Sequence, residues 1–169
     1  LCQMNLLLHG LDAPQIDPGN SLRFKLTDIG ERDRVDVILT NPPFGTRGAN
    51  QAPDREDFTI ATSNKQLNFL QHVMTILKPG GRAGIVLPDG TLFGEGVKTR
   101  IKEKLLSECN LHTIVRLPNG VFNPYTGIRT NLLFFTKGAP TTAVWYYEHP
   151  YPPGAKSYNK GKPIRIEEF

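Results

Sequence analysis

The sequence predicts an α/β layered fold with a mostly parallel sheet. The first observation is that short apolar runs rich in β-branched residues alternate with longer segments of helical periodicity. The second is that the strand-like run RVDVILT is apolar on both faces, as strands are in a parallel sheet covered by helices. In layered sheets of this kind, ligands bind beyond the carboxyl ends of the strands, so the residues that follow each strand are the candidates for a site.

The first half of the chain predicts two helices and one strand. Residues 1–8 (LCQMNLLL) have the pattern of a helix end, and Gly10 follows as a C-terminal cap residue. Residues 34–40 (RVDVILT) are a buried strand, and the polar stretch 45–62 after it is long for a connection. Ser63 and Gln66 have the spacing of a capping box. The helix behind them ends at KPGG (78–81), and its apolar positions are Leu67, Leu70, Val73, Met74 and Leu77.

The second half predicts one helix and four more strands. Residues 82–88 (RAGIVLP), 111–118 (LHTIVRLP) and 130–137 (TNLLFFTK) are apolar strands, and residues 143–149 (AVWYYEH) form a fifth. A helix is predicted from about residue 97 to residue 109, with Val97, Ile101 and Leu105 facing inward. Its outward cations, which we interpret as a solvated face with phosphate contact as the alternative, are Lys98, Arg100, Lys102 and Lys104.

Composition and charge argue against several classes of protein. No apolar run approaches the roughly 20 residues of a membrane span. Cys2 and Cys109 lie far apart without CxxC spacing and the four histidines show no ligand spacing, so we expect no disulfide, no metal site and a reducing cytoplasm. Residues 61–169 carry 14 Lys/Arg against 7 Asp/Glu. That excess fits either a polyanion partner or a solvated surface, and charge alone favours the surface.

The most informative stretch is VDVILTNPPFGTRG (35–48), where two consecutive prolines follow the first strand. They fix φ twice and remove two backbone donors, which makes a stiff corner. The side-chain carbonyl of Asn41 and the main-chain carbonyl of Pro42 can both accept hydrogen bonds from a purine amino group, which localises the lone pair of its nitrogen. Phe44 can stack on the base. An electrophilic methyl group in line would complete a displacement that depends on positioning alone.

The motif and its flanks resemble one family. Asn-Pro-Pro-aromatic after a buried strand is similar to the catalytic motif of S-adenosylmethionine-dependent amino-group methyltransferases. The flanking blocks resemble the modification subunit of type I restriction–modification systems, an N6-adenine DNA methyltransferase, along nearly the whole chain. These blocks are QMNLLLHG, NPPFG, SNKQLNFLQHVMTILKPGGRAGIVLPDG, PNGVF, TGIRTNLLFFTKG and WYYEHPYP.

The resemblance implies a fold, a cofactor and partners. The implied fold is the Rossmann-like class I S-adenosylmethionine-dependent methyltransferase fold, with a mostly parallel sheet flanked by helices. The implied cofactor is S-adenosylmethionine. The implied partners are double-stranded DNA, from which one adenine is flipped, and the specificity and restriction subunits of the same system. No membrane is involved, and the implied location is the cytoplasm.

The resemblance also implies roles for single residues. The residues that match the catalytic motif are Asn41, Pro42, Pro43 and Phe44. The family usually has an acidic residue, often within Gly-Asp-Ser-Leu, in contact with the cofactor's adenine; here the tetrapeptide is Gly19-Asn20-Ser21-Leu22, so Asn20 takes that position. The implied cofactor contacts are therefore Asn20, Ser21, Leu22, Asn41 and Pro43. The implied stacking partners of the flipped base are Phe44 and Phe122, the latter from PNGVF.

The family's Gly-rich cofactor loop and the acidic residue on the cofactor's ribose do not occur in these 169 residues. In the resembled family both come earlier in the chain, so we expect the N-terminal strands of the fold to lie upstream of Leu1. Residues 1–138 would then be a partial methyltransferase catalytic domain. Residues 139–169 would be a C-terminal extension, with a strand at 143–149 and an extended tail. We expect this piece alone to transfer no methyl group.

Two alternative functions stay open at this point. The tetrapeptide alone also fits rRNA guanine and protein-glutamine methyltransferases, although the flanking blocks favour DNA. In a non-catalytic assembly module, the same residues would be only a rigid turn. Tyr146, Tyr147 and Tyr151 fit either a docking surface for a partner subunit or a small aromatic cluster. Nothing in the chain resembles a target-recognition domain, so the DNA recognition sequence is not readable from it.

Overall fold

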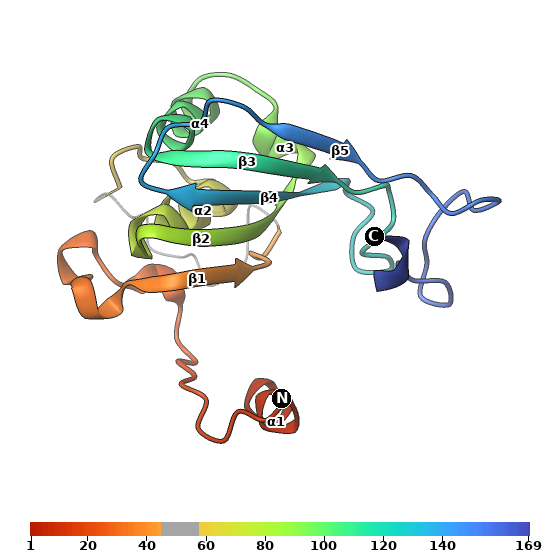
Figure 1. Cartoon of the computed structure of the whole chain (residues 1–169), viewed down its shortest axis with the longest axis horizontal. Helices are drawn as coiled ribbons and strands as arrows, with labels where there is room; N and C mark the ends of the chain where they lie inside the picture. Colours follow the sequence, from red (N-terminus) through yellow and green to blue (C-terminus); the bar gives the residue numbers. More distant parts are fainter. Residues whose placement is uncertain (45–57) are drawn as a thin grey trace.

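Five strands form one mixed sheet in the part of the chain that the structure describes (Figure 1). The computed structural model describes residues 1–44 and 58–169. The strands lie in the spatial order β1-β2-β4-β3-β5, and β4 is antiparallel to both of its neighbours whereas the other four strands share one direction. The predicted α/β fold with a mostly parallel sheet is confirmed. The strand bounds are β1 (Val35–Thr40), β2 (Leu77–Pro88), β3 (Cys109–Arg116), β4 (Thr130–Lys137) and β5 (Trp145–Glu148).

The reversed direction of β4 follows from its connection to β3. The two strands are consecutive and adjacent, and residues 117–129 between them form no helix. Parallel neighbours need a crossover, usually a helix, so a loop that returns directly makes an antiparallel pair. As a consequence, the loop 117–129 lies at the sheet edge where β1, β2 and β3 end. This is the edge at which the sequence predicted a site.

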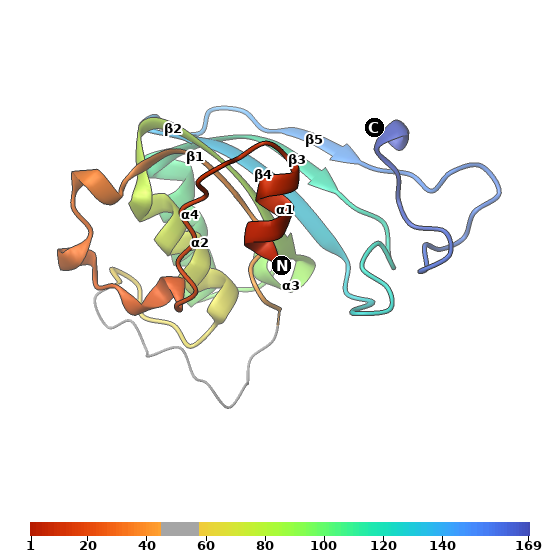
Figure 2. The ribbon, with the colours of Figure 1, turned by 90° about the horizontal axis from the view of Figure 1, so that it is seen from below.

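Helices α2 and α4 lie on the same side of the sheet (Figure 2). The helices are α1 (Cys2–Leu8), α2 (Lys65–Ile76), α3 (Asp89–Leu92) and α4 (Val97–Glu108). Four short 3₁₀ turns complete the described chain: η1 (Ser21–Arg23), η2 (Leu26–Asp28), η3 (Glu31–Asp33) and η4 (Ile166–Glu168). No helix within residues 1–44 and 58–169 is long and apolar enough to cross a bilayer.

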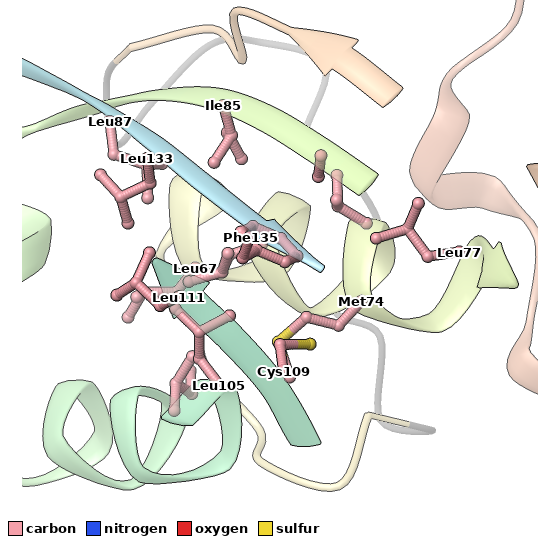
Figure 3. Close-up of a cluster of buried hydrophobic side chains, with 14 of the residues drawn as sticks. Leu67, Met74, Leu77, Ile85, Leu87, Leu105, Cys109, Leu111, Leu133 and Phe135 are labelled. Carbon is pink, nitrogen blue, oxygen red and sulfur yellow. The ribbon is translucent and has the colours of Figure 1, made fainter. Parts of the chain in front are cut away.

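The hydrophobic core lies between these two helices and the inner face of the sheet (Figure 3). Leu67 and Met74 of α2 and Leu105 of α4 meet Ile85 and Phe135 of the sheet, all nearly inaccessible to solvent. On β1 the side chains alternate. Ile38 packs against this core, whereas Val37 and Leu39, which point to the other face, are 53% and 79% exposed. We expected helices on both faces of the sheet. Helices α2 and α4 lie on the same side, so they cover only one of the two faces.

The start of α2 differs from the predicted capping box. The cap is Asn64, whose side chain accepts a hydrogen bond from the main-chain nitrogen of Leu67 at 3.0 Å. Ser63 is exposed and does not cap the helix. Gln66 is buried and its amide bonds elsewhere, as described below. The prediction was wrong because the capping-box pattern is local, whereas the partner of Gln66 lies 23 residues away.

The end of α2 is held by a side chain from the sheet. The Lys137 ammonium, on β4, donates to the main-chain oxygens of Met74 (2.6 Å), Thr75 (3.3 Å) and Leu77 (3.0 Å). A cation on the last carbonyls of a helix satisfies acceptors that have no partner within the helix and suits its dipole. Partial burial lowers the pKa of Lys137. The register of β1 on β2 then jumps from Val35–Leu77 to Val37–Arg82, so KPGG bulges out of the pairing.

The chain beyond β5 has little regular secondary structure but is attached to the sheet, since the His149 nitrogen donates to the Arg116 oxygen. β5 is shorter than the predicted strand 143–149. His149 and Tyr158 are both 3% exposed, and residues 159 and 162 form a β-bridge. Side chains in this segment are therefore packed against the folded body.

We predict that Asn64→Ala lowers the unfolding free energy by about 1 kcal/mol, because the mutation removes the cap of α2. Chemical denaturation of Asn64→Ala and of the wild-type protein measures this loss of unfolding free energy. Ser63→Ala is the matched control, since Ser63 is one residue away and makes no cap bond, and it should leave stability unchanged. A larger loss for Ser63→Ala than for Asn64→Ala would contradict the assignment of the cap.

Candidate functional site

The Asn41–Phe44 corner lies at the carboxyl end of β1. β1 and β2 are parallel and Thr40 pairs with Ile85, so the corner stands beside the end of β2. Pro42 is buried and Asn41 is exposed. Among residues 1–44 and 58–169, nothing hydrogen-bonds the Asn41 side chain. The corner is therefore anchored by one proline while its amide stays available to a ligand.

Phe44 and Phe122 meet at this edge. Their ring centroids are 6.1 Å apart and the rings are perpendicular, an edge-to-face contact. Such aromatic pairs are favourable by about 0.5–1.5 kcal/mol beyond the area that they bury. The two residues are 78 positions apart in sequence, and their contact brings the segments that follow β1 and β3 together at one edge of the sheet. An edge-on neighbour occupies one face of a ring, so a planar base can lie between the two rings only after this contact opens.

Three amide side chains of α2 bind main-chain carbonyls, one in the corner and two in the segment just before the helix. Gln66 Nε2 donates to the Pro43 oxygen at 3.3 Å. Asn68 Nδ2 donates to the Thr62 oxygen and Gln71 Nε2 to the Ile60 oxygen, both at 2.9 Å. All three amides are at least 95% buried. Residues 45–57 lie outside the described residues. Through these amides, α2 binds Pro43 on one side of that segment and Ile60 and Thr62 on the other.

These amides were missed by sequence reasoning. Gln66 was expected in a capping box, and Asn68 and Gln71 were assigned no role. The available signal was that three amide side chains, Gln66, Asn68 and Gln71, lie among the apolar residues of one helix. Buried amides need hydrogen-bond partners, so their presence on the inner face indicates main chain to be held there.

An ionic cluster joins the ends of three strands beside the corner. Asp89 follows β2, and its carboxylate accepts from Arg116 Nη2 of β3 at 2.9 Å and from Asn131 Nδ2 of β4 at 2.6 Å. The Asp89 nitrogen donates to the Arg129 oxygen at 2.9 Å. The hydrogen bond to Asp89 raises the pKa of the Arg116 guanidinium. Both ends of the Phe122 loop are therefore tied to the turn after β2.

The segment around Asn20 is a capped turn against α2. Asn20 Oδ1 accepts from the Leu22 nitrogen at 3.0 Å and thereby caps η1. Leu22 is 1% exposed, and η1 contacts α2. The structure thus gives Asn20 and Leu22 a local structural role.

A hollow on the exposed face of the sheet borders the corner. It measures about 330 Å³ and is lined by Leu39, Asn41, Gly84 and Phe134, among others. A Cβ added at Gly84 would lie 2.9 Å from a Leu39 methyl and 3.1 Å from the Phe134 ring, so only glycine leaves this floor open. The hollow gives the exposed amide of Asn41 a cavity beside it.

The described residues contain no cluster of three potential metal ligands among their His, Cys, Asp and Glu side chains. Cys2 is exposed and Cys109 is buried, and both are free thiols. Burial raises the pKa of the Cys109 thiol to about 11, which keeps it protonated near neutral pH. Cys109 is therefore a core residue and no nucleophile.

Comparison with known proteins identifies the family. The family model described as N-6 DNA Methylase matches residues 1–169. The chain belongs to the N-6 DNA methylase family. It is 57% identical to the type I restriction enzyme EcoEI methylase subunit of Escherichia coli over an alignment of 172 positions, which covers all of this chain and 34% of that protein. The predicted resemblance to type I modification subunits is confirmed, and the chain spans about a third of such a subunit.

Two solved structures agree with this assignment. The modification subunit of a putative type I restriction enzyme from Vibrio vulnificus superposes with a TM-score of 0.88 at 52% identity, covering 99% of this chain and 36% of that one. A putative class I S-adenosylmethionine-dependent methyltransferase from Listeria monocytogenes superposes with a TM-score of 0.52 at 22% identity, covering 68% of this chain and 37% of that one. The second likeness concerns the fold alone, and it confirms the predicted class I methyltransferase fold.

Proposed function

We propose that this chain is the part of a type I methylase subunit that activates the target amino group. The subunit would transfer a methyl group from S-adenosylmethionine to N6 of an adenine flipped out of double-stranded DNA. The observation that carries the proposal is the stiff, donor-free corner at the end of β1, with an exposed Asn41 and with Phe122 brought against Phe44. Residues 1–138 would belong to the catalytic domain, and residues 139–169 would extend it.

The chain's own residues would act by position and charge. Asn41 Oδ1 and the Pro42 oxygen accept hydrogen bonds from the two hydrogens of the adenine amino group, which draws its nitrogen toward tetrahedral geometry and aims its lone pair. Phe44 stacks on the base, and Phe122 covers its other side once the edge-to-face contact opens. Gln66 holds the Pro43 oxygen and so keeps the corner from rotating. No protein nucleophile is required.

S-adenosylmethionine would supply a methyl group on a positively charged sulfur. Two features of the chain suit it. Asn41 and Pro43 are part of the corner, and Asn41, whose side chain has no hydrogen-bond partner among the described residues, lines a hollow. Asn20 Oδ1 accepts one hydrogen bond from its own turn and retains a second lone pair for an amino group. Ser21 and Leu22 would complete the contact on the cofactor's adenine.

Double-stranded DNA, a specificity subunit and a restriction subunit would be the partners. The similar Escherichia coli protein is a subunit of a type I restriction enzyme, so a separate subunit would read the DNA sequence. Because its substrate would be DNA, the protein would be located in the bacterial cytoplasm.

Labelled methyl transfer tests the class of substrate. The full-length methylase subunit, assembled with its specificity subunit, is offered DNA, rRNA and release factor separately. We expect label on DNA alone, recovered as N6-methyladenine. Label on rRNA guanine or on a protein glutamine would favour the related enzymatic alternatives, and no label on any substrate would leave a non-catalytic assembly module.

We predict that Asn41→Ala in the full-length subunit lowers the methylation rate about 10²–10³-fold or more, because a preorganised acceptor of the transition state is lost. Folding stability should be unchanged, since Asn41 is exposed. Asn41→Asp keeps a carbonyl-type acceptor of the same shape and should retain more activity than Asn41→Ala. Near-normal turnover of Asn41→Ala in single-turnover assays would contradict the catalytic role.

We predict that Gln66→Met lowers kcat about 10-fold with little change in KM, since small misplacements of reacting groups are costly. Methionine has a similar length but leaves the Pro43 oxygen without its donor. Gln71→Met is the matched control: Gln71 is equally buried on the same helix, but its amide binds Ile60. Steady-state kinetics and thermal unfolding of both variants separate the effects. Equal losses of kcat in both variants would mean that Gln66 has only a structural role.

A further inference from the structure

The segment after β5 is basic and its charges are free. Residues 149–166 contain no Asp or Glu and contain four cations, Lys156, Lys160, Lys162 and Arg165. All four are exposed, and none of the ion pairs among the described residues involves them. We call residues 149–166 the basic extension. Its unpaired positive charge is available to an anionic partner.

The cations of α4 differ in this respect. Lys98 Nζ donates to the Gly90 oxygen and Lys102 Nζ donates to the Leu92 oxygen. Lys104 pairs with Glu108 one turn along the helix. Three of the four α4 cations thus make a hydrogen bond or an ion pair within the protein, whereas no ion pair among the described residues involves a cation of the basic extension.

The basic extension is fixed to the loop that carries Phe122. Tyr158 is 3% exposed, and its main-chain oxygen accepts from Asn123 Nδ2 at 3.2 Å. The Tyr151 hydroxyl donates to the Asn119 oxygen at 3.0 Å, and the Tyr151 and Tyr158 rings lie 5.5 Å apart. Asn119 and Asn123 flank Phe122 in sequence. The extension is therefore attached on both sides of the residue proposed to stack on the target base.

Close packing at Gly120 requires glycine. Its φ is +80°, and a Cβ there would lie 3.0 Å from the Tyr158 oxygen and 2.7 Å from Asn123 Nδ2. Both features disfavour any other residue. The loop and the extension are thus in close contact at Gly120, and the extension has a defined position relative to Phe122.

Three cations of the basic extension lie on a hydrogen-bonded turn or line a hollow. Asn159 and Lys162 exchange main-chain hydrogen bonds, and Asn159 Oδ1 accepts from the nitrogens of Gly161 and Lys162, so the turn that carries Lys160 is closed on itself. Lys162 and Arg165 line one hollow of about 360 Å³, together with Ser157 and Glu168. The Glu168 carboxylate is occupied by the Tyr158 hydroxyl and the Arg165 nitrogen. The hollow thus combines two cations with one carboxylate, and the charges of these three side chains sum to one positive charge.

We propose that the basic extension binds the phosphate backbone of DNA next to the flipped adenine. This inference rests on the proposed function, because it takes the Phe122 loop as the side on which the base enters. Contacts to phosphates carry no sequence information but set the register of a duplex on a protein. The extension would therefore hold the strand at the distance from Asn41 at which the flipped base reaches the corner.

The salt dependence of DNA binding tests this proposal. Each phosphate contact contributes about −0.9 to the slope of log K against log salt concentration. The variant is Lys160→Gln/Lys162→Gln/Arg165→Gln in the full-length methylase subunit assembled with its specificity subunit. Binding of duplex DNA with and without the target site is measured between 50 and 200 mM salt, roughly the range in which such contacts are resolved. We expect the slope to become shallower by about 2–3 and the affinity for both duplexes to fall alike.

The matched control removes the same charge elsewhere. Lys25→Gln/Arg32→Gln/Arg100→Gln changes three exposed cations of the η2–η3 segment and α4. That segment and helix lie at the opposite end of the sheet from the extension (Figure 1), so the slope should stay within about 0.5 of wild type. All six side chains are exposed, so thermal unfolding should be unchanged. If the triple variant does not fold, Lys160→Gln alone replaces it, and the slope of log K against log salt concentration should then become shallower by about 0.9.

Two results would overturn the proposal: an unchanged slope in the extension variants, or an equal change in the control. Either result would leave the proposed function standing if wild-type protein still methylates adenine. Failure of the wild-type protein to methylate any DNA would instead remove the proposed function itself.

Discussion

The arrangement of the site depends on one rigid corner, the pair of prolines that ends β1. Pro42 and Pro43 have fixed φ angles and no N–H groups, so the carbonyls around them meet no local donor. β1 is held in register by β2, and the buried amide of Gln66 reaches the Pro43 oxygen from α2. The corner is thus defined by three separate elements. Asn41 needs no packing role of its own and stays exposed for a ligand.

The reversed strand β4 determines what surrounds the corner. Because β4 returns directly from β3, the loop 117–129 is kept at the carboxyl edge, and the Asp89 cluster ties its two ends to the turn after β2. That loop supplies Phe122 to the corner on one side and binds Tyr158 on the other. A single loop therefore connects the aromatic wall of the site with the basic extension, which are separate in sequence but adjacent in space.

The features that sequence could predict are those coded locally. An apolar β-branched run followed by two prolines locates the end of β1, and the helix predicted from about 97 to 109 is α4, Val97–Glu108. The features that it could not predict depend on distant partners. Gln66 matched a capping box, but its amide binds Pro43. For Asn20 the structure adds a local role that the sequence did not indicate, since its side chain caps its own turn; the predicted cofactor contact stays a prediction. The tail that we expected to be extended contains Tyr158, which is buried and whose main-chain oxygen binds Asn123, 35 residues earlier.

The central claim is that the corner presents two carbonyl oxygens to the amino group of the target base. A structure of the full-length methylase subunit, with its specificity subunit, target DNA and a non-reactive analogue of the cofactor, tests this most directly. The account predicts an extruded adenine whose amino nitrogen lies about 3 Å from both Asn41 Oδ1 and the Pro42 oxygen, with Phe44 stacked on its ring. An adenine that is extruded elsewhere, or whose amino group faces away from both oxygens, would contradict it.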